Sequence, residues 1–492
     1  MMPDHTRHCE RSLASRGNGL TLFALFIVVA LGLSACANLP DSQPQATLRD
    51  ASSLGLSSEP EATAALDAQW WREFGDAQLN RLIDEALLSS PTLKIVQTRL
   101  TRANVAADVT DAASGPQLNA TVDAMQQKFT ATGLYPPPLA GSIYATGTAQ
   151  LTGSWELDFF GKNRAALDAA LGNARATQAD AAAARTLLAS NVARNYFQLL
   201  RLNAQLGVAR RQLAQREQLL RLVTDRVNAG LDTRLELRQS EGTLPEARLQ
   251  IESQNEQMAL TRHALSALLG QSANTPELEL PALASIKNRA VATNVPSDLL
   301  GRRADIAAAR WRVEAATQDV SHAHSQFYPN INLVAFAGFS SIGLDRLLGA
   351  GSEQWGVGPA LRLPLFDGGR LQANLRGKAT DLDAAIESYN AAVIEAVRDV
   401  ADQLASAQSI NRQQTEQRAA QAAAESAYAI AMQRYEAGLS NLLTVLTAET
   451  AVLSQRRMAL DLAARALDVQ VALMRALGGG YHAELPASMA QK

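Results

Sequence analysis

Few residues of this chain have the types and spacing that catalysis or metal binding requires. Arg302, Arg303 and Asp305 combine two cations and a carboxylate, but we expect them to form an ion-pair network at the start of a helix. His322 and His324 are two residues apart, which places them on different helix faces and makes them a poor metal pair. The sequence contains neither a phosphate-binding loop nor a nucleophile elbow. We therefore expect no enzyme activity, no metal and no cofactor.

Cys36 is the residue best placed for a covalent modification. Three arginines precede an apolar run at residues 20–33, the arrangement of a secretory signal. The run ends in the sequence LSAC at 33–36, which resembles a bacterial lipobox. By that resemblance, residues 1–35 are a lipoprotein signal peptide. The thiol of Cys36 then carries diacylglycerol, its amino group carries an acyl chain (palmitate), and residues 36–69 form a lipidated linker.

The alternative for this segment is an uncleaved inner-membrane anchor. Its apolar stretch is about 14 residues, short of the ~20 that a spanning helix needs. Ala37 follows the cysteine. By analogy with enteric lipoproteins, in which Asp at that position retains the protein in the inner membrane, Ala37 is permissive for the outer membrane.

Composition limits the remaining possibilities. The 492 residues include 45 Lys+Arg and 48 Asp+Glu, a balance that gives no sign of a nucleic-acid partner. The chain is 47% apolar but only 5% aromatic and is rich in alanine, which favours long helices. The two cysteines precede the expected folded part and cannot form a disulfide framework. The eight methionines are scattered, so a copper-export role has no support.

An internal repeat organises the rest of the chain. The sequence RVNAGL at 226–231 recurs as RYEAGL at 434–439, an offset of 208 residues, and the same offset aligns residues further downstream. A repeat this long indicates a duplicated domain. We expect a first repeat at 70–270, a connector at 271–296, a second repeat at 297–480 and a C-terminal tail at 481–492.

Each repeat is predicted to contain a long helical hairpin. Residues 162–228 and 370–436 are proline-free runs of 67 residues, and each is followed by a glycine, Gly230 or Gly438, that can end a helix. Asp232 and Ser440 are then the candidate N-caps of the returning helices. The alternative is a broken bundle with interruptions at Gly172, Gly207 and Gly377.

Two regions have the period of a β-strand. Apolar and polar residues alternate from 144 to 159, and residues 118–124 can form the partner strand. A second pair is expected at 331–339 and 355–365. Half of the 24 aromatic residues lie in 117–160 and 327–366, as in the aromatic girdles of membrane β-barrels. The alternative is the edge of a soluble β-sandwich.

Four strands cannot close a barrel, and an open edge in lipid leaves backbone groups unpaired. The chain must therefore associate, and two copies would supply eight strands and three copies twelve. The expected fold class is an α+β membrane protein in which long helical hairpins join a β-barrel made by several chains.

Five motifs, in order, resemble the outer-membrane factor family of tripartite efflux pumps, the TolC/OprM-like channels, and its lipoprotein branch in particular. The resemblance covers nearly the whole mature chain. The motifs are WWREFGD at 70–76, WELDFFG at 155–161, LLGRRADI at 299–306, FYP at 327–329 and PLFDGG at 364–369. The third motif has Ala304 where the family usually has proline.

The resemblance implies a homotrimer with a twelve-stranded barrel and a periplasmic helical tunnel. It also implies a periplasmic adaptor (membrane fusion protein) at the helical tips, an inner-membrane pump that we expect to be proton-driven, and an outer-membrane location. The implied function is passive conduction of small toxic compounds or antibiotics. The alternatives are the duct of a polypeptide (type I) secretion system and a pore-less periplasmic coiled-coil scaffold.

The resemblance also implies roles for residues at the tips. Glu236 would pair with Tyr435, next to Arg434, and Leu443 would form a hydrophobic constriction of the gate. Thr444 and Thr447 occupy positions that are often acidic in the family, which argues against a cation-binding ring. The adaptor-contact residues would be Gly230, Leu231, Gly438 and Leu439.

Overall fold

The computed structural model describes residues 44–49, 67–272, 278–287 and 302–481. The chain divides into two compact units: one comprises residues 1–47, 105–172 and 313–385, and the other comprises 48–104, 173–312 and 386–492. The units cut across both expected repeats, because each repeat supplies two strands to the first unit and helical segments to the second. In the described part of the chain, no helix is both long enough and apolar enough to cross a membrane.

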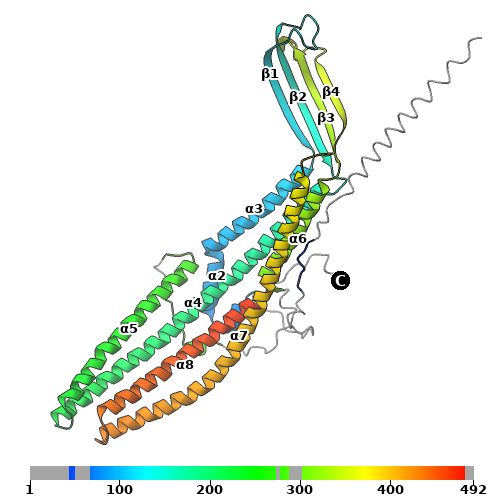
Figure 1. Cartoon of the computed structure of the whole chain (residues 1–492). Coiled ribbons are helices and arrows are strands. Elements are labelled where there is room, and N and C mark those ends of the chain that lie inside the picture. Colours follow the sequence, from blue (N-terminus) through cyan, green and yellow to red (C-terminus); the bar gives the residue numbers. More distant parts are fainter. Residues whose placement is uncertain (1–43, 50–66, 273–277, 288–301, 482–492) are drawn as a thin grey trace, which may run out of the picture. The chain divides into compact units, whose positions relative to one another are not determined.

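The first unit contains one antiparallel sheet of four strands in the order β1-β2-β3-β4. The strands are β1 (Gln117–Lys128), β2 (Ile143–Leu157), β3 (Asn330–Ile342) and β4 (Glu353–Arg362), and Figure 1 shows them side by side. Both expected strand pairs are confirmed, and pairing of β2 with β3 joins them into one sheet. The last strand ends before the predicted residue 365, because Pro364 lacks the N–H that a further ladder bond needs.

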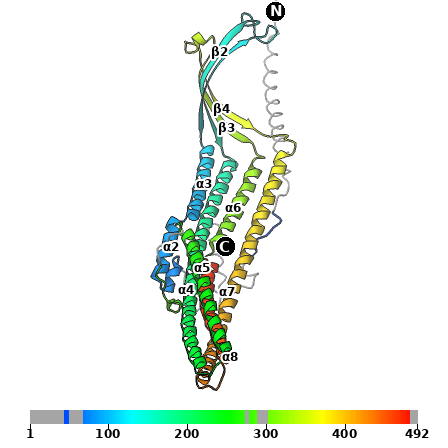
Figure 2. The same ribbon diagram turned by 90° about the vertical axis from the view of Figure 1, so that its left-hand side faces the viewer.

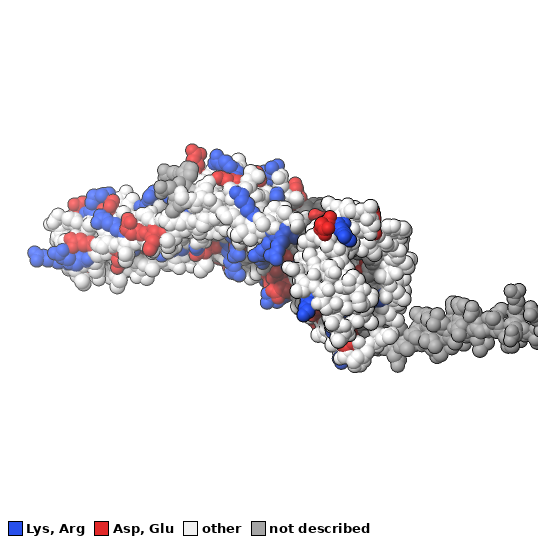
Figure 3. All heavy atoms as spheres, turned by 90° about the horizontal axis from the view of Figure 1, so that it is seen from above, with Lys and Arg blue, Asp and Glu red and all other residues white. Residues whose placement is uncertain are grey.

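The register brings the alternation of all four strands into phase. Directly opposed residues lie on the same face of a sheet. Leu151 lies opposite Ala120 and Ala337, and Ala337 lies opposite Trp355. The other face carries polar residues at the same level, where Gln354 donates a hydrogen bond of 2.9 Å to Gln150. The surface of the sheet is mostly uncharged in Figure 3, whereas charged side chains are scattered over the helices. The sheet therefore has one mostly apolar face and one more polar face, on which β3 also places Val334, Phe336 and Ile342.

The helices form two hairpins of equal length. The first hairpin is α4 (Lys162–Asn228) followed by α5 (Arg234–Leu268). The second is α7 (Arg370–Glu436) followed by α8 (Leu442–Ala476). Both long helices have 67 residues and both returning helices have 35, and the long helices run without interruption through the glycines considered as breaks. Both turns are visible in Figures 1 and 2.

The expected N-caps are one residue off in both turns. Thr233 caps α5 and Asn441 caps α8, in place of the predicted Asp232 and Ser440. The Thr233 hydroxyl accepts from the backbone N–H of Leu235, and the Asn441 amide oxygen accepts from that of Thr444. Asp232 therefore has no capping role.

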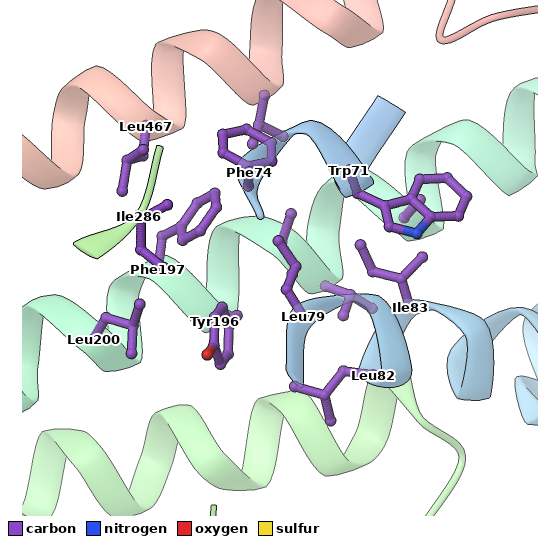
Figure 4. Close-up of a cluster of buried hydrophobic side chains, with 14 of the residues drawn as sticks. Trp71, Phe74, Leu79, Leu82, Ile83, Tyr196, Phe197, Leu200, Ile286 and Leu467 are labelled. Atoms are coloured by element: carbon purple, nitrogen blue, oxygen red, sulfur yellow. The ribbon is translucent and has the colours of Figure 1, made fainter. Parts of the chain in front are cut away.

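Short helices complete the fold: a 3-10 turn η3 (Trp70–Phe74), α2 (Ala77–Ser89), α3 (Pro91–Ser114) and α6 (Ala304–Ser325). The largest apolar cluster lies in the second unit, where the aromatic residues of η3 and α2 side chains pack on α4 (Figure 4). Within this cluster the hydroxyl of Tyr196 donates a 2.7 Å hydrogen bond to Asp76, whose carboxylate also caps α2. Burial and this bond to a carboxylate raise the pKa of Tyr196.

Candidate functional site at the helical tips

The two hairpin turns have the same backbone geometry. In the first tip, residues 226–236, the N–H of Gly230 bonds to the carbonyl of Val227 and that of Leu231 to Arg226. In the second tip, residues 434–444, Gly438 bonds to Tyr435 and Leu439 to Arg434 in the same way. This is the Schellman motif, with a left-handed glycine after the last helical residues. Gly230 has φ 74° and Gly438 φ 77°.

Three side chains connect the two tips. Tyr435, near the end of α7, donates a hydrogen bond of 2.5 Å to Oδ2 of Asp232 in the turn between α4 and α5. Arg226 of α4 donates to the same carboxylate from two nitrogens, at 2.9 and 3.2 Å. The Arg226 guanidinium also lies over the Tyr435 ring, 4.6 Å from its centre. We call Arg226, Asp232 and Tyr435 the tip contact.

The neighbouring groups in the tip contact favour the ionised forms of Asp232 and Arg226. The hydrogen bond from Arg226 is the main cause that lowers the pKa of Asp232, and the bond from Tyr435 lowers it further. The bond to Asp232 raises the pKa of Arg226, and burial together with the neighbouring carboxylate raises that of Tyr435. At neutral pH the site therefore holds a carboxylate, a guanidinium and a neutral phenol.

An apolar cluster lies behind the tip contact. Tyr435 is completely buried, at 0% exposure, and packs with residues of α4 and α8: Leu219, Val223, Leu442 and Val445. A hydrogen bond to a charged group is stronger when water is kept away from it. The cluster thus shields one side of the bond that joins the hairpins.

The expected pairing of Glu236 with Tyr435 is wrong. Glu236 instead bonds back to the backbone N–H and the hydroxyl of Thr233, completing a capping box at the start of α5. A capping box requires the acid at the third helical position to turn toward its own N-cap. That geometry leaves Asp232, four residues earlier, to accept from Tyr435. Sequence reasoning considered Asp232 only as a cap and did not single out Arg226 for a role at the tip.

The other predicted gate residues lie outside the tip contact. The side chain of Leu443 is 61% exposed, and Thr444 and Thr447 are exposed on the same helix. The Thr444 hydroxyl donates to Asn441 and the Thr447 hydroxyl to the carbonyl of Leu443. Arg434 is exposed as well. These four residues thus form part of an open surface within one chain, and their gate role stays a prediction.

The predicted adaptor-contact residues are also at the surface. Leu231 and Leu439, which follow the two tip glycines, are exposed apolar side chains at matching positions of the two turns. A Cβ added at Gly230 or Gly438 would meet no atom within 4 Å. Both turns are therefore open to a partner, and their contact with an adaptor remains a prediction.

The remaining candidates are structural or lie outside the described residues. Arg303 forms an ion pair of 2.7 Å with Asp305 and donates to the carbonyl of Ala476, which confirms the expected network at the start of α6 for Arg303 and Asp305. His322 bonds to the carbonyl of Lys162, and within the described ranges no group of three metal-ligating side chains is present. Cys36 lies outside the described residues.

Comparison with known proteins places these features in a family. The family model described as "Outer membrane efflux protein" matches residues 82–271 and 295–479. The multidrug resistance outer membrane protein MdtQ of Escherichia coli O6:H1 is 35% identical over 429 residues, 84% of this chain and 88% of that protein. The fusaric acid resistance protein FusA of Burkholderia cepacia is 36% identical over 376 residues, 74% of this chain and 70% of that protein.

A solved structure agrees with these relatives. The outer membrane protein VceC of Vibrio cholerae matches with a TM-score of 0.79 and 35% identity, over 85% of this chain and all of that one. CusC, described as forming a transmembrane channel, matches with a TM-score of 0.79 and 28% identity, over 90% of this chain and 99% of that one. The family model covers well over half of the chain, and its matched residues include all four strands of the sheet and both hairpins. This chain therefore belongs to the outer membrane efflux protein family and is an outer-membrane component of an efflux system.

Proposed function

We propose that three copies of this chain form a trimeric channel that passively conducts small toxic compounds out of the periplasm. The observation that carries this proposal is the register of the sheet, which gathers most apolar side chains of the four strands on one face. Its apolar face suits lipid, and its polar face suits a water-filled interior. Among the described residues, β1 and β4 each pair with a single strand, so both outer edges of the sheet are open to further pairing.

The open edges support assembly. An unpaired edge in hydrocarbon leaves N–H and C=O groups without partners, and a closed barrel removes that cost. Pairing β4 of one copy with β1 of the next closes twelve strands in a trimer, the number that the family resemblance implies. The four helices of each copy would continue the barrel as a tunnel.

The relatives support small compounds as cargo. MdtQ is named for multidrug resistance and FusA for fusaric acid resistance. Both names favour export of small molecules over export of polypeptides. Because the duct conducts passively and needs no cofactor, the energy for export would come from an inner-membrane pump. We propose that this pump is proton-driven and that a periplasmic adaptor connects it to the tips.

The tip contact would act as the gate of this duct. It joins the turn of the first hairpin to the second hairpin by a charge-assisted hydrogen bond, and three copies would repeat it around the axis. Leu443, exposed beside it, would narrow the aperture. Cys36 would carry the lipid that anchors the N-terminus in the outer membrane.

Native mass spectrometry combined with planar-bilayer recording tests the assembly. We expect a species of three chains that produces discrete conductance steps. If folded protein extracted from membranes is a monomer or dimer and produces no conductance in the bilayer, the proposed channel is overturned.

A further inference from the structure

A buried ionic contact also joins the two hairpins above the tip, between α4 and α8. Arg216 of α4 and Glu449 of α8 are 9% and 4% exposed. The Arg216 Nε lies 3.3 Å from both carboxylate oxygens of Glu449. Along α8, Glu449 continues the buried stripe of Leu442 and Val445 that contacts α4 near the tip.

The pair is enclosed within one chain. Arg216 also donates at 2.8 Å to the backbone carbonyl of Thr243 and lies 3.6 Å from Glu246, both on α5. Turning the side-chain amide of the buried Gln212 brings its oxygen 3.0 Å from an Arg216 nitrogen. Arg216 thus holds both helices of the first hairpin and reaches across to the second. This burial does not depend on how copies of the chain assemble.

A buried ion pair is an inefficient means of stabilisation. Apolar residues of similar volume often stabilise a core at least as well, because two charges lose their hydration. Loss of one partner is strongly unfavourable, however, since the other charge stays buried alone. Such a pair fixes which helices face each other and at what register, and it holds them until both charges can become hydrated together.

Among the described residues, the second repeat shows no corresponding contact between hairpins. The residue that corresponds to Glu449 at the offset of 208 is Glu241, which pairs with Arg238 on its own helix. The comparable pair in the second hairpin is Glu425 with Arg456, 3.0 Å apart, which connects α7 with α8 inside one hairpin. Arg216 and Glu449 differ from these two pairs by bridging the two hairpins. Two further ion pairs also bridge α4 and α8, Arg201 with Asp461 and Arg194 with Asp468, but they lie farther from the tip and their side chains are more exposed.

We propose that Arg216 and Glu449 form a second tie between the hairpins, which limits how far they separate once the tip contact is released. Arg216 precedes Arg226 by ten residues on α4, so the tie lies ~15 Å from the tip contact along the helix. Opening then proceeds in two stages. Release at Tyr435 frees only the tips, and hydration of the buried pair lets the hairpins part above them. This inference rests on the proposed gate.

A double-mutant cycle in planar bilayers tests the tie. Glu449→Gln keeps the shape of the side chain and removes its charge. With the tip contact intact, Glu449→Gln alone should change the open probability little. In a Tyr435→Phe background it should raise the open probability roughly tenfold, the scale of one lost charge-assisted contact. Glu425→Gln in the same background is the matched control and should have no such effect. The charge swap Arg216→Glu with Glu449→Arg should return the open probability toward that of Tyr435→Phe.

A crosslink provides a measurement that does not leave a charge buried alone. Arg216→Cys with Glu449→Cys, in the Tyr435→Phe background, is recorded before and after a short bifunctional thiol reagent. The crosslinked channel should open far less than the untreated one. Equal opening before and after crosslinking, or additive effects in the cycle, would overturn the tie and leave the tip gate standing. If Tyr435→Phe itself changes nothing, the gate and the tie both fail.

Discussion

The phenolic oxygen of Tyr435 lies 2.5 Å from Oδ2 of Asp232, although 203 residues separate them in the chain. This hydrogen bond joins the end of α7 to the turn between α4 and α5. The carboxylate that accepts it is held by two nitrogens of Arg226, so it is already oriented toward the phenol. Three side chains, those of Tyr435, Asp232 and Arg226, thus make this contact between the tips.

Removing the bond should open the tip. Tyr435→Phe with Asp232→Asn deletes the hydroxyl and the charge, and a hydrogen bond to a charged group contributes about 1.5–3 kcal/mol. We expect more frequent openings in planar bilayers and greater entry of a large antibiotic such as vancomycin into cells. Glu236→Gln is the matched control, because Glu236 is four residues away and only caps α5. An equal effect of that control would contradict the assignment.

The pH dependence of the tip follows from Asp232. Its pKa is lowered from 3.8, so the closed contact binds a proton less readily than the open one. Stability from such a group is present above its ordinary pKa and is lost as pH falls through the lowered value. Open probability should stay unchanged from neutral pH to about pH 5 and rise only in strong acid. Asp232→Asn should abolish that rise.

The long helices could be predicted to the residue because their limits are local. A proline-free run that ends at a glycine determines where α4 and α7 stop, and both bounds agree with the structure. The four strands could also be predicted from their alternation, but their bounds differ from the predicted ones by up to four residues. These features depend on neighbours in the chain and hardly at all on distant ones.

The contacts between hairpins could not be predicted in the same way. The partner of Tyr435 was a choice between two acids four residues apart, and the capping box at Thr233 decided it. Arg216 and Glu449 are 233 residues apart, and only the packing of α4 on α8 brings them together. A charged residue within an apolar stripe, as at Glu449, is a signal that sequence reasoning could have used.

The two faces of the sheet should differ in tolerance to charge. Leu151→Arg places a cation on the apolar face, where a midplane arginine costs about 2–4 kcal/mol in a membrane barrel. Thr152→Arg, at the next residue of β2, places the same cation on the polar face and should assemble normally. The yield of assembled protein on a native gel measures the difference. Equal yields would contradict the assignment of the apolar face to lipid.

Lipid attachment is expected at Cys36. Intact-mass spectrometry of the purified protein should show a chain that begins at this residue and carries diacylglycerol and an acyl chain. Cys36→Ser should leave the precursor unprocessed, while Cys9→Ser, which changes the other cysteine, should process normally. A mature N-terminus at another residue, or an unmodified thiol, would refute the lipobox assignment.

The tip glycines are expected to be required for docking of the adaptor. Gly230 and Gly438 have positive φ and empty space around them, so a substitution there acts through backbone strain and not through a clash. A left-handed non-glycine residue costs roughly 1–2 kcal/mol, and a β-branched one more. Valine at either position should distort the turn that presents Leu231 or Leu439. Drug export should then fall, while trimers remain in the outer membrane. Gly242→Ala, in α5 with open space and no positive φ, is the control and should export normally. Full export by the valine variants, with the complex still recovered by co-purification of the adaptor, would place the docking surface elsewhere on the hairpins.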